Sequence, residues 1–356
     1  MANDVSEFEC CFVLGAGASC DFGYPTGLEL IRNISKSLLK PSEKLLQELD
    51  LLESVAEMLE AAWSTNLKLS NYCQMLGNRI YFSGVTSIDR FISINQDNNV
   101  YQDICKYMIV RELLSAERRS LNPCAKEEGN LSNECFRWRQ NWLRVFFGCF
   151  FVKNTIDDLL KYLECNKVCF ISFNYDRLME YFLVQAIINL YGLEIEGKPE
   201  DLKKLNTVMN AVKILHVYGK FDGKNIDIKK LLRDYGALGG DISSLSKNIQ
   251  TIRFDQTLPD EYSLVIEKSK KVYFLGFGFD DMNVNILTKN IGFPTNKFRS
   301  TNYGLSDQVI NKINVKFKHA IEWPSETDQK VYEFVNNRFG SKMNRVSSRG
   351  ETSYPE

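Results

Sequence analysis

Apolar positions along the chain follow two kinds of pattern, and the first kind predicts strands. Short, nearly continuous apolar runs are typical of parallel strands that are covered on both faces. Such runs occur at Phe8 to Leu14, Val168 to Phe173, Val212 to Val217, Val272 to Phe277, Phe298 to Tyr303 and Val315 to Ile321. Helical spacing separates several of them, as in Arg177 to Tyr191 and Ser306 to Ile313. This alternation predicts an α/β fold with a Rossmann-like, doubly wound parallel sheet.

The second kind of pattern fills the segment between the first two runs. Residues 33–161 carry apolar residues at heptad-like spacing, in "EKLLQELDLLESVAEMLEAAW" and in "NWLRVFFGCFFVKNTIDDLLKYL". We therefore expect a large helical insertion over 33–161, placed after the first strand and helix of the sheet. The α/β domain then comprises residues 1–32 and 162–340. The polar residues 341–356 are predicted to form a flexible tail.

Charge and composition narrow the partners that we expect. The 44 Lys and Arg residues nearly balance the 45 Asp and Glu residues, so the net charge of -1 does not indicate a nucleic-acid partner. The longest apolar run, Val145 to Val152, is far shorter than the roughly 20 residues that a membrane helix needs. The N-terminal stretch is acidic where a signal peptide is basic, and the cysteines are scattered. We expect a cytoplasmic protein with reduced thiols and no membrane association.

A glycine-containing turn follows the first predicted strand. In "VLGAGAS" the strand ends at Leu14, and Gly15 and Gly17 then precede a helical pattern. Such a turn lets backbone N–H groups approach a ligand and directs a helix N-terminus at it, which suits a pyrophosphate. The dehydrogenase fingerprint G-x-G-x-x-G would need glycine at position 20, where Cys20 stands. An ordinary NAD dehydrogenase is thus a poor match, and the alternative that the glycines only form a tight turn stays open.

Three further stretches follow the ends of predicted strands: "FNYDRLME" from Phe173, "LHVYG" from Leu215 and "LGFGFDDMN" from Leu275. The carboxyl ends of parallel strands share one edge of a sheet, where ligands of such folds bind. Together with "GAGAS", these stretches resemble the sirtuin family, and most closely its bacterial branch of NAD-consuming defence proteins. The resemblance covers roughly residues 8–31 and 165–325, and "SIDRFI" at Ser87 to Ile92 is similar to a segment in the helical insertion of those members.

The resemblance implies that NAD+ is the substrate and lies across the strand ends. It assigns NAD-binding roles to Gly15, Ala16, Gly17, Ser19, Pro25, Asp176, Gly276, Phe277, Gly278 and Asp281. Asp176 matches the aspartate that binds the nicotinamide carboxamide, and its alternative role is a charge favoured by the helix dipole. The first loop matches the pyrophosphate site, whereas Gly276 and Gly278 match the loop on the adenine side. Asp281 either caps the next helix or meets a ribose.

Two residues match the catalytic positions of the family, Asn174 and His216. The Asn174 amide would position a water or the nicotinamide ribose, and its alternative role is that of a turn or helix-cap asparagine. A neutral His216 imidazole would take a proton from a ribose hydroxyl or from water, and its alternative role is that of a core histidine. The other histidine, His319, matches no motif and is interpreted as structural.

The reaction that the resemblance implies is cleavage of the bond between nicotinamide and ribose, with water yielding ADP-ribose. Protein-deacylating sirtuins carry a zinc module of two C-x-x-C pairs after the catalytic histidine. Residues 217–356 contain no cysteine, so we expect no zinc. The stretch "YPTG" at 24–27 also departs from the deacylase pattern. These departures favour an NAD+ glycohydrolase over two alternatives: an NAD-dependent protein deacylase or ADP-ribosyltransferase, and a non-catalytic NAD- or ADP-ribose-sensing subunit.

Unrestrained NAD+ hydrolysis would kill the host cell, so we expect a gated effector of antiphage defence that depletes NAD+. After the sheet and the insertion are assigned, too few residues remain for a separate sensor domain. We therefore expect a homo-oligomer, with the helical insertion as its interface. A separate activator, such as a HerA-type ATPase or a nucleotide-sensing subunit, would supply the trigger.

Overall fold

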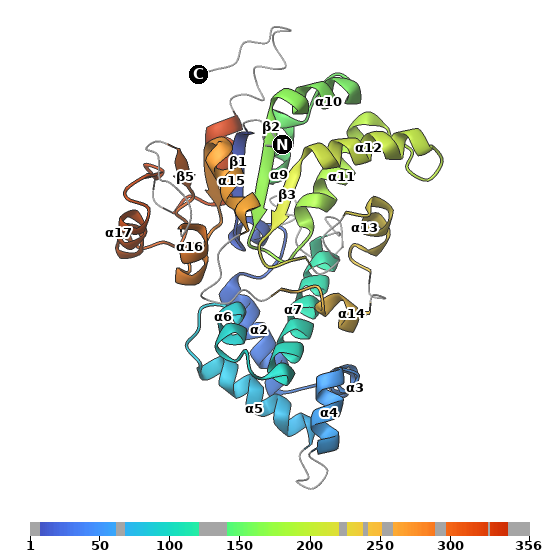
Figure 1. The fold of residues 1–356 in the computed structure, drawn as a ribbon, viewed down its shortest axis with the longest axis vertical. Helices are drawn as coiled ribbons and strands as arrows, with labels where there is room; N and C mark the ends of the chain where they lie inside the picture. Colours follow the sequence, from blue (N-terminus) through green and yellow to red (C-terminus); the bar gives the residue numbers. More distant parts are fainter. Residues whose placement is uncertain are drawn as a thin grey trace, which may run out of the picture.

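The computed structural model describes residues 8–61, 68–120, 141–220, 226–237, 241–250, 259–288, 297–326 and 328–340. Its centre is a sheet of parallel strands in the order β3-β2-β1-β4-β5-β6 (Figure 1). The strands are β1 (Phe8–Leu14), β2 (Lys167–Ser172), β3 (Lys213–His216), β4 (Ser269–Leu275), β5 (Phe298–Ser300) and β6 (Ile321–Glu322). The predicted Rossmann-like α/β fold is confirmed. In folds of this kind, ligands bind at the carboxyl ends of the strands.

The register of the strands brings distant motifs to one edge of the sheet. Leu14 at the end of β1 pairs with Ser172 of β2 and with Leu275 of β4. Ser172 in turn pairs with His216, the last residue of β3. All these strands therefore end level with one another, and the loops that follow them share the carboxyl edge.

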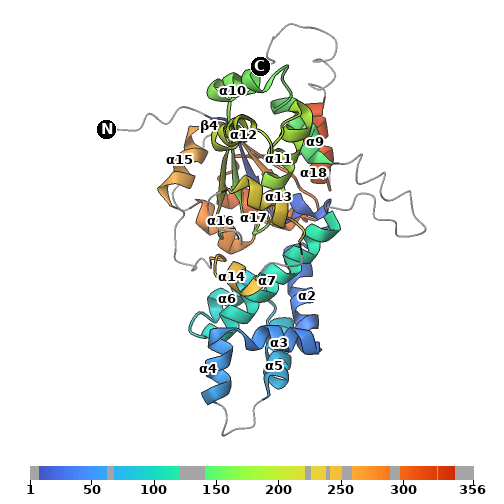
Figure 2. The ribbon, with the colours of Figure 1, turned by 90° about the vertical axis from the view of Figure 1, so that its right-hand side faces the viewer.

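Helices cover both faces of this sheet (Figure 2). After β1 come α1 (Gly17–Cys20) and then α2 (Gly27–Leu39), α3 (Glu43–Asp50), α4 (Glu53–Ala61), α5 (Leu69–Phe82), α6 (Ile88–Ile94) and α7 (Asn99–Ser120). The later helices are α9 (Trp142–Phe150), α10 (Ile156–Cys165), α11 (Leu178–Tyr191), α12 (Pro199–Ala211), α13 (Ile228–Asp234), α14 (Ile242–Ser246), α15 (Asp260–Lys268), α16 (Asp281–Thr288), α17 (Asp307–Lys316) and α18 (Val331–Val335), followed by the π-helical turn η2 (Asn336–Gly340).

A helical lobe lies at the carboxyl edge of the sheet, built from α2 to α7 (Figure 1), so it begins at Gly27, before the predicted residue 33. The heptad-like pattern from residue 43 is divided between α3 and α4, because a turn follows Asp50. Helix α2 packs along α5 and α7, and α14, from the connection between β3 and β4, packs against α7. The lobe therefore receives one helix from the second half of the chain.

The insertion ends earlier than the predicted residue 161. Helix α9 packs on the sheet itself, where Phe146 meets Phe12 of β1 edge to face at 5.1 Å and Phe170 of β2 at 5.3 Å. Helix α10 lies against β2 and α12. Helical periodicity shows which face of a helix is apolar but not which surface it covers, so the boundary could not be read from the pattern.

One predicted strand is wrong. Residues 315–320 end helix α17 and form a turn, and only Ile321–Glu322 pairs as β6. Ser306 caps the helix, and Ile313 and Phe317, four residues apart, turn one face toward the core, where Phe317 meets Phe274 at 5.6 Å. His319 is exposed in the turn with a φ of 58°.

The predicted tail, residues 341–356, lies outside the described ranges. Of the helices within them, none has the length and apolar character needed to cross a membrane.

Candidate active site

A small cavity lies where β1, β2 and β3 end. It is bordered by the last residues of these strands, by the loop and first turn that lead into α11, and by α1 and α9; the polar side chains among them belong to Ser19, Trp142, Ser172, Asn174, Asp176, Glu180 and His216. The cavity has room for about one water molecule. Residues from four separate stretches of the sequence therefore meet around one enclosed point.

Asn174 connects the loop after β2 to the loop after β1. Its side-chain Nδ2 donates to the carbonyl of Gly15 at 3.0 Å and to Oγ of Ser19 at 3.2 Å. Its own backbone N–H donates to Oγ of Ser172 at 3.1 Å. The alternative of a helix cap is wrong, because α11 starts at Leu178 and its N-cap residue is Arg177. The buried amide is instead fixed by contacts at the carboxyl edge.

Asp176 continues this chain of hydrogen bonds. Oγ of Ser19 donates to its Oδ2 at 2.9 Å, and the backbone N–H of Leu178 donates to its Oδ1 at 3.1 Å. Burial raises the pKa of Asp176 to about 6, although both hydrogen bonds favour its ionised form. The site therefore holds a carboxyl group that titrates close to neutral pH.

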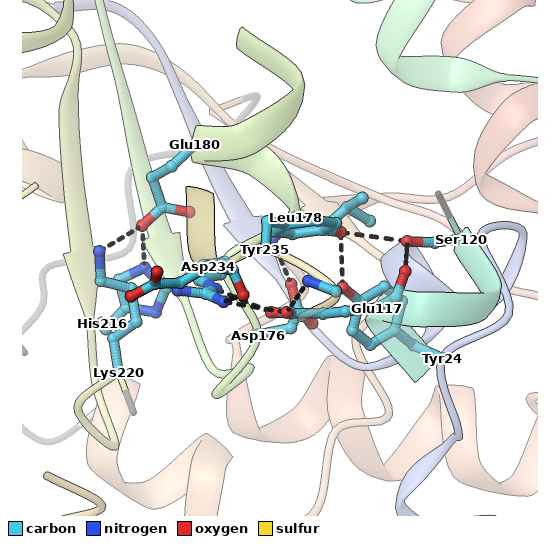
Figure 3. Close-up of polar contacts among 12 residues, drawn as sticks. Tyr24, Glu117, Ser120, Asp176, Leu178, Glu180, His216, Lys220, Asp234 and Tyr235 are labelled. Carbon is cyan, nitrogen blue, oxygen red and sulfur yellow. Dashed lines mark hydrogen bonds and ion pairs between the residues drawn. The ribbon is translucent and has the colours of Figure 1, made fainter. Parts of the chain in front are cut away.

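His216 differs from the neutral, free imidazole that we expected. Its Nδ1 lies 3.1 Å from the carbonyl oxygen of Asn174, and its Nε2 lies 2.8 Å from Oε1 of Glu180 (Figure 3). A carbonyl oxygen only accepts, so Nδ1 carries a proton, and Nε2 shares another with the carboxylate. Burial lowers the pKa of His216, but Glu180 outweighs this effect and the pKa is raised. In this arrangement neither nitrogen presents a lone pair to a substrate.

Glu180 lies at the centre of a buried charge cluster. Nζ of Lys220 lies 3.4 Å from the same Oε1 that His216 meets, and the side chains of Glu180 and Lys220 are 1% and 2% exposed. Burial raises the pKa of Glu180, but Lys220 and His216 lower it to about 2. Glu180 is therefore ionised, and two cationic partners stabilise it.

The glycines of the first loop serve the packing of two loops. The N–H of Gly15 donates to the carbonyl of Leu275 at 3.0 Å, and the N–H of Gly17 donates to that of Gly276 at 3.0 Å. A Cβ on Gly15 would lie 2.5 Å from the Gly276 oxygen, and Gly276 has a φ of +57°. These two N–H groups thus point into the protein rather than toward a ligand. The tight-turn alternative accounts for them.

The remaining predicted residues lie apart from this network. Phe277 is buried and meets Phe173 edge to face at 5.0 Å, which is a packing role. Asp281 starts α16 and pairs on the surface with Lys312 and Lys316 of α17. Gly278 is exposed, and Ala16 and Pro25 are half-buried in the segment between β1 and α2. The structure brings together Ser19, Asn174, Asp176 and His216, but it does not bring Pro25, Gly278 or Asp281 into contact with them.

A second buried ion pair, which sequence reasoning missed, joins the insertion to this site. Nε of Arg177 donates to Oε1 of Glu117 in α7 at 2.8 Å, and the N–H of Gly236 donates to the other oxygen at 3.0 Å. Tyr235 stacks on Tyr181 with ring centroids 3.7 Å apart. Arg177 directly follows Asp176, so the position of this loop depends on the helical lobe.

Three residues of the site itself were also missed. Glu180 lies in the first turn of α11, four residues after Asp176, and an acidic residue so close to the end of a predicted strand was a usable signal. Lys220 and Trp142 gave no signal, because a sequence does not show which lysine or tryptophan is buried beside a site. Nε1 of Trp142 donates to the carbonyl of Ala18 at 2.7 Å and so ties α9 to α1.

No family model and no curated protein matches this chain. Within the ranges listed above, no three His, Cys, Asp or Glu side chains are grouped as metal ligands would be.

Proposed function

We propose that this chain is an NAD+ glycohydrolase that cleaves NAD+ into nicotinamide and ADP-ribose. The observation that carries the proposal is the hydrogen-bonded chain from Gly15 through Asn174 and Ser19 to Asp176, with His216 on the Asn174 carbonyl. These residues come from three motifs that lie far apart in the sequence. They meet at the carboxyl edge of the sheet, the place where such folds bind nucleotides.

The charges of the site suit this chemistry. When the bond between nicotinamide and ribose breaks, nicotinamide leaves with the electron pair, and positive charge develops on the ribose ring. A buried carboxylate beside the ring stabilises that charge, and Asp176 borders the cavity. The fixed amide of Asn174 would orient a ribose hydroxyl, so that the reacting atoms start in position. No redox step and no metal ion is needed.

The present cavity is too small for nicotinamide, so binding of NAD+ requires the elements around it to separate. This supports gating: we propose an effector of antiphage defence whose activity depends on self-association or on a separate activator protein. Tyr81, Phe82 and Ile94 on the helical lobe are exposed by 60%, 78% and 66%, which supports the lobe as the interface. The ion pair of Glu117 and Arg177 would transmit movement of the lobe to Asp176.

The test is incubation of the purified full chain with NAD+ and chromatographic detection of nicotinamide and ADP-ribose. We expect Asn174→Ala to lower nicotinamide release at least ~100-fold. The matched control is Asn189→Ala, an exposed asparagine of α11, with unchanged release. Equal rates in wild type and Asn174→Ala would contradict the proposal. Nicotinamide release that needs an acylated peptide would favour a deacylase instead. Tight NAD+ binding without nicotinamide release, both with and without candidate activators, would favour a sensing subunit.

A further inference from the structure

Glu180 uses only one of its two carboxylate oxygens. His216 and Lys220 both lie at Oε1, at 2.8 Å and 3.4 Å. Oε2 is buried and has no hydrogen-bond partner among the described residues. In Figure 3 this second oxygen points away from both cations. Leaving a buried charged acceptor without a hydrogen bond is costly, so its retention calls for an explanation.

The surroundings of Glu180 indicate what this oxygen can bind. The residue borders the cavity, which has room for about one water molecule. The carboxylate remains ionised, because His216 and Lys220 lie beside it, so Oε2 accepts a hydrogen bond from a polar guest. A second carboxyl group, Asp176, borders the same cavity, but Ser19 and the N–H of Leu178 already engage its two oxygens.

His216 does not compete for this role. Both of its nitrogens face acceptors, so it cannot take a proton from water unless its contact with Glu180 breaks. The imidazole and Lys220 instead hold Oε1 in place, and this fixes the direction of Oε2.

Building on the NAD+ glycohydrolase function proposed above, we propose that Glu180 is the catalytic residue that binds the attacking water. Oε2 accepts a hydrogen bond from the water in the cavity. The bond from C1′ to the nicotinamide nitrogen breaks first, and the water oxygen then forms a bond to C1′ of the ribosyl cation that is left. Nicotinamide leaves as a neutral molecule with the electron pair. The proton of the water passes to the Glu180 carboxylate and then to solvent when ADP-ribose leaves.

The test compares two reactions of the full chain in one vessel. Hydrolysis to ADP-ribose needs the bound water, whereas exchange of labelled free nicotinamide into NAD+ needs cleavage of the same bond but no water. We expect Glu180→Gln to lower hydrolysis by about 100-fold or more and to keep exchange within about threefold of wild type. The control Glu194→Gln removes an exposed carboxylate that pairs with Lys198, and it should change neither rate.

The outcomes separate this inference from the proposed function. A wild-type chain that performs neither reaction, with and without candidate activator proteins, refutes both. Exchange and hydrolysis that fall together in Glu180→Gln, or hydrolysis that stays at the wild-type rate, would overturn the role of Glu180 alone. Glu180→Asp keeps the charge, so it should recover part of the hydrolysis lost in Glu180→Gln. It also serves as the test if thermal unfolding shows that the Gln variant does not fold.

Discussion

Asp176→Asn should stabilise the folded protein while it weakens the site. The carboxyl group is 7% exposed, and its pKa is raised from 3.8 to about 6 by burial. Its ionised form therefore costs the folded protein about 3 kcal/mol at neutral pH, because each unit of pKa corresponds to about 1.4 kcal/mol. The Asn amide still accepts from Leu178 but cannot accept from Ser19, a loss of about 1 kcal/mol. The net expected gain is about 2 kcal/mol.

The pH dependence of this gain follows from the direction of the shift. The folded protein binds the Asp176 proton more tightly than the unfolded chain does, so wild type loses stability as the pH rises from about 4 to about 6. At pH 5 only about half of that loss has occurred, so the gain of the variant shrinks to less than about 1 kcal/mol. We expect lower nicotinamide release from the stabilised variant, as is common when a buried charge serves function.

The assay is urea unfolding followed by tryptophan fluorescence and by circular dichroism, at pH 7.5 and at pH 5. The control is Asp157→Asn, whose side chain is 62% exposed and which should change the free energy of unfolding by less than about 0.5 kcal/mol. A variant less stable than wild type at pH 7.5, or a gain that is the same at both pH values, would refute the reasoning.

Three further predictions concern packing around the site. Gly276→Ala should lower the free energy of unfolding by more than about 3 kcal/mol, because its φ is +57° and a Cβ would lie 2.1 Å from a backbone nitrogen of α1. The control is Gly278→Ala, where a Cβ would meet nothing within 4 Å, and it should lower the free energy of unfolding by less than about 1 kcal/mol. Equal losses in urea unfolding would contradict this prediction. Glu117→Gln should cost about 3–5 kcal/mol, since it leaves Arg177 buried without its anionic partner; an unchanged urea midpoint would count against it. Trp142→Phe should lower the free energy of unfolding by about 1 kcal/mol, because it removes the 2.7 Å hydrogen bond to the Ala18 carbonyl; an unchanged midpoint of thermal unfolding would contradict this.

The strands were predictable from sequence because a central parallel strand is apolar on both faces. Cys11, Phe12 and Val13 are fully buried, so this strand is marked by an unbroken apolar run rather than by alternating apolar and polar residues. The run from Val315 failed for the reason that short apolar runs often fail: apolar residues four apart, as at Phe317 and Ile313, fit a helix equally well. Only packing against Phe274 decides between the two.

The candidate site was predictable only in part. The rule that parallel strands end at one edge correctly brought Asn174 and His216 together, through the Asn174 carbonyl. The partners of His216 could not be foreseen, because burial of Glu180 and Lys220 depends on packing that no local pattern encodes. Gly15 and Gly17 were ambiguous for a related reason. A backbone that approaches a ligand closely and a backbone that packs closely against Gly276 both require glycine.

The central claim is that the loops after β1, β2 and β3 together bind NAD+ and cleave it. A crystal structure with ADP-ribose, the expected product, tests this most directly. We expect the ribose that carried nicotinamide beside Asn174 and Glu180, with the cavity enlarged. ADP-ribose bound elsewhere, with the contacts of Asn174 and His216 unchanged, would contradict it.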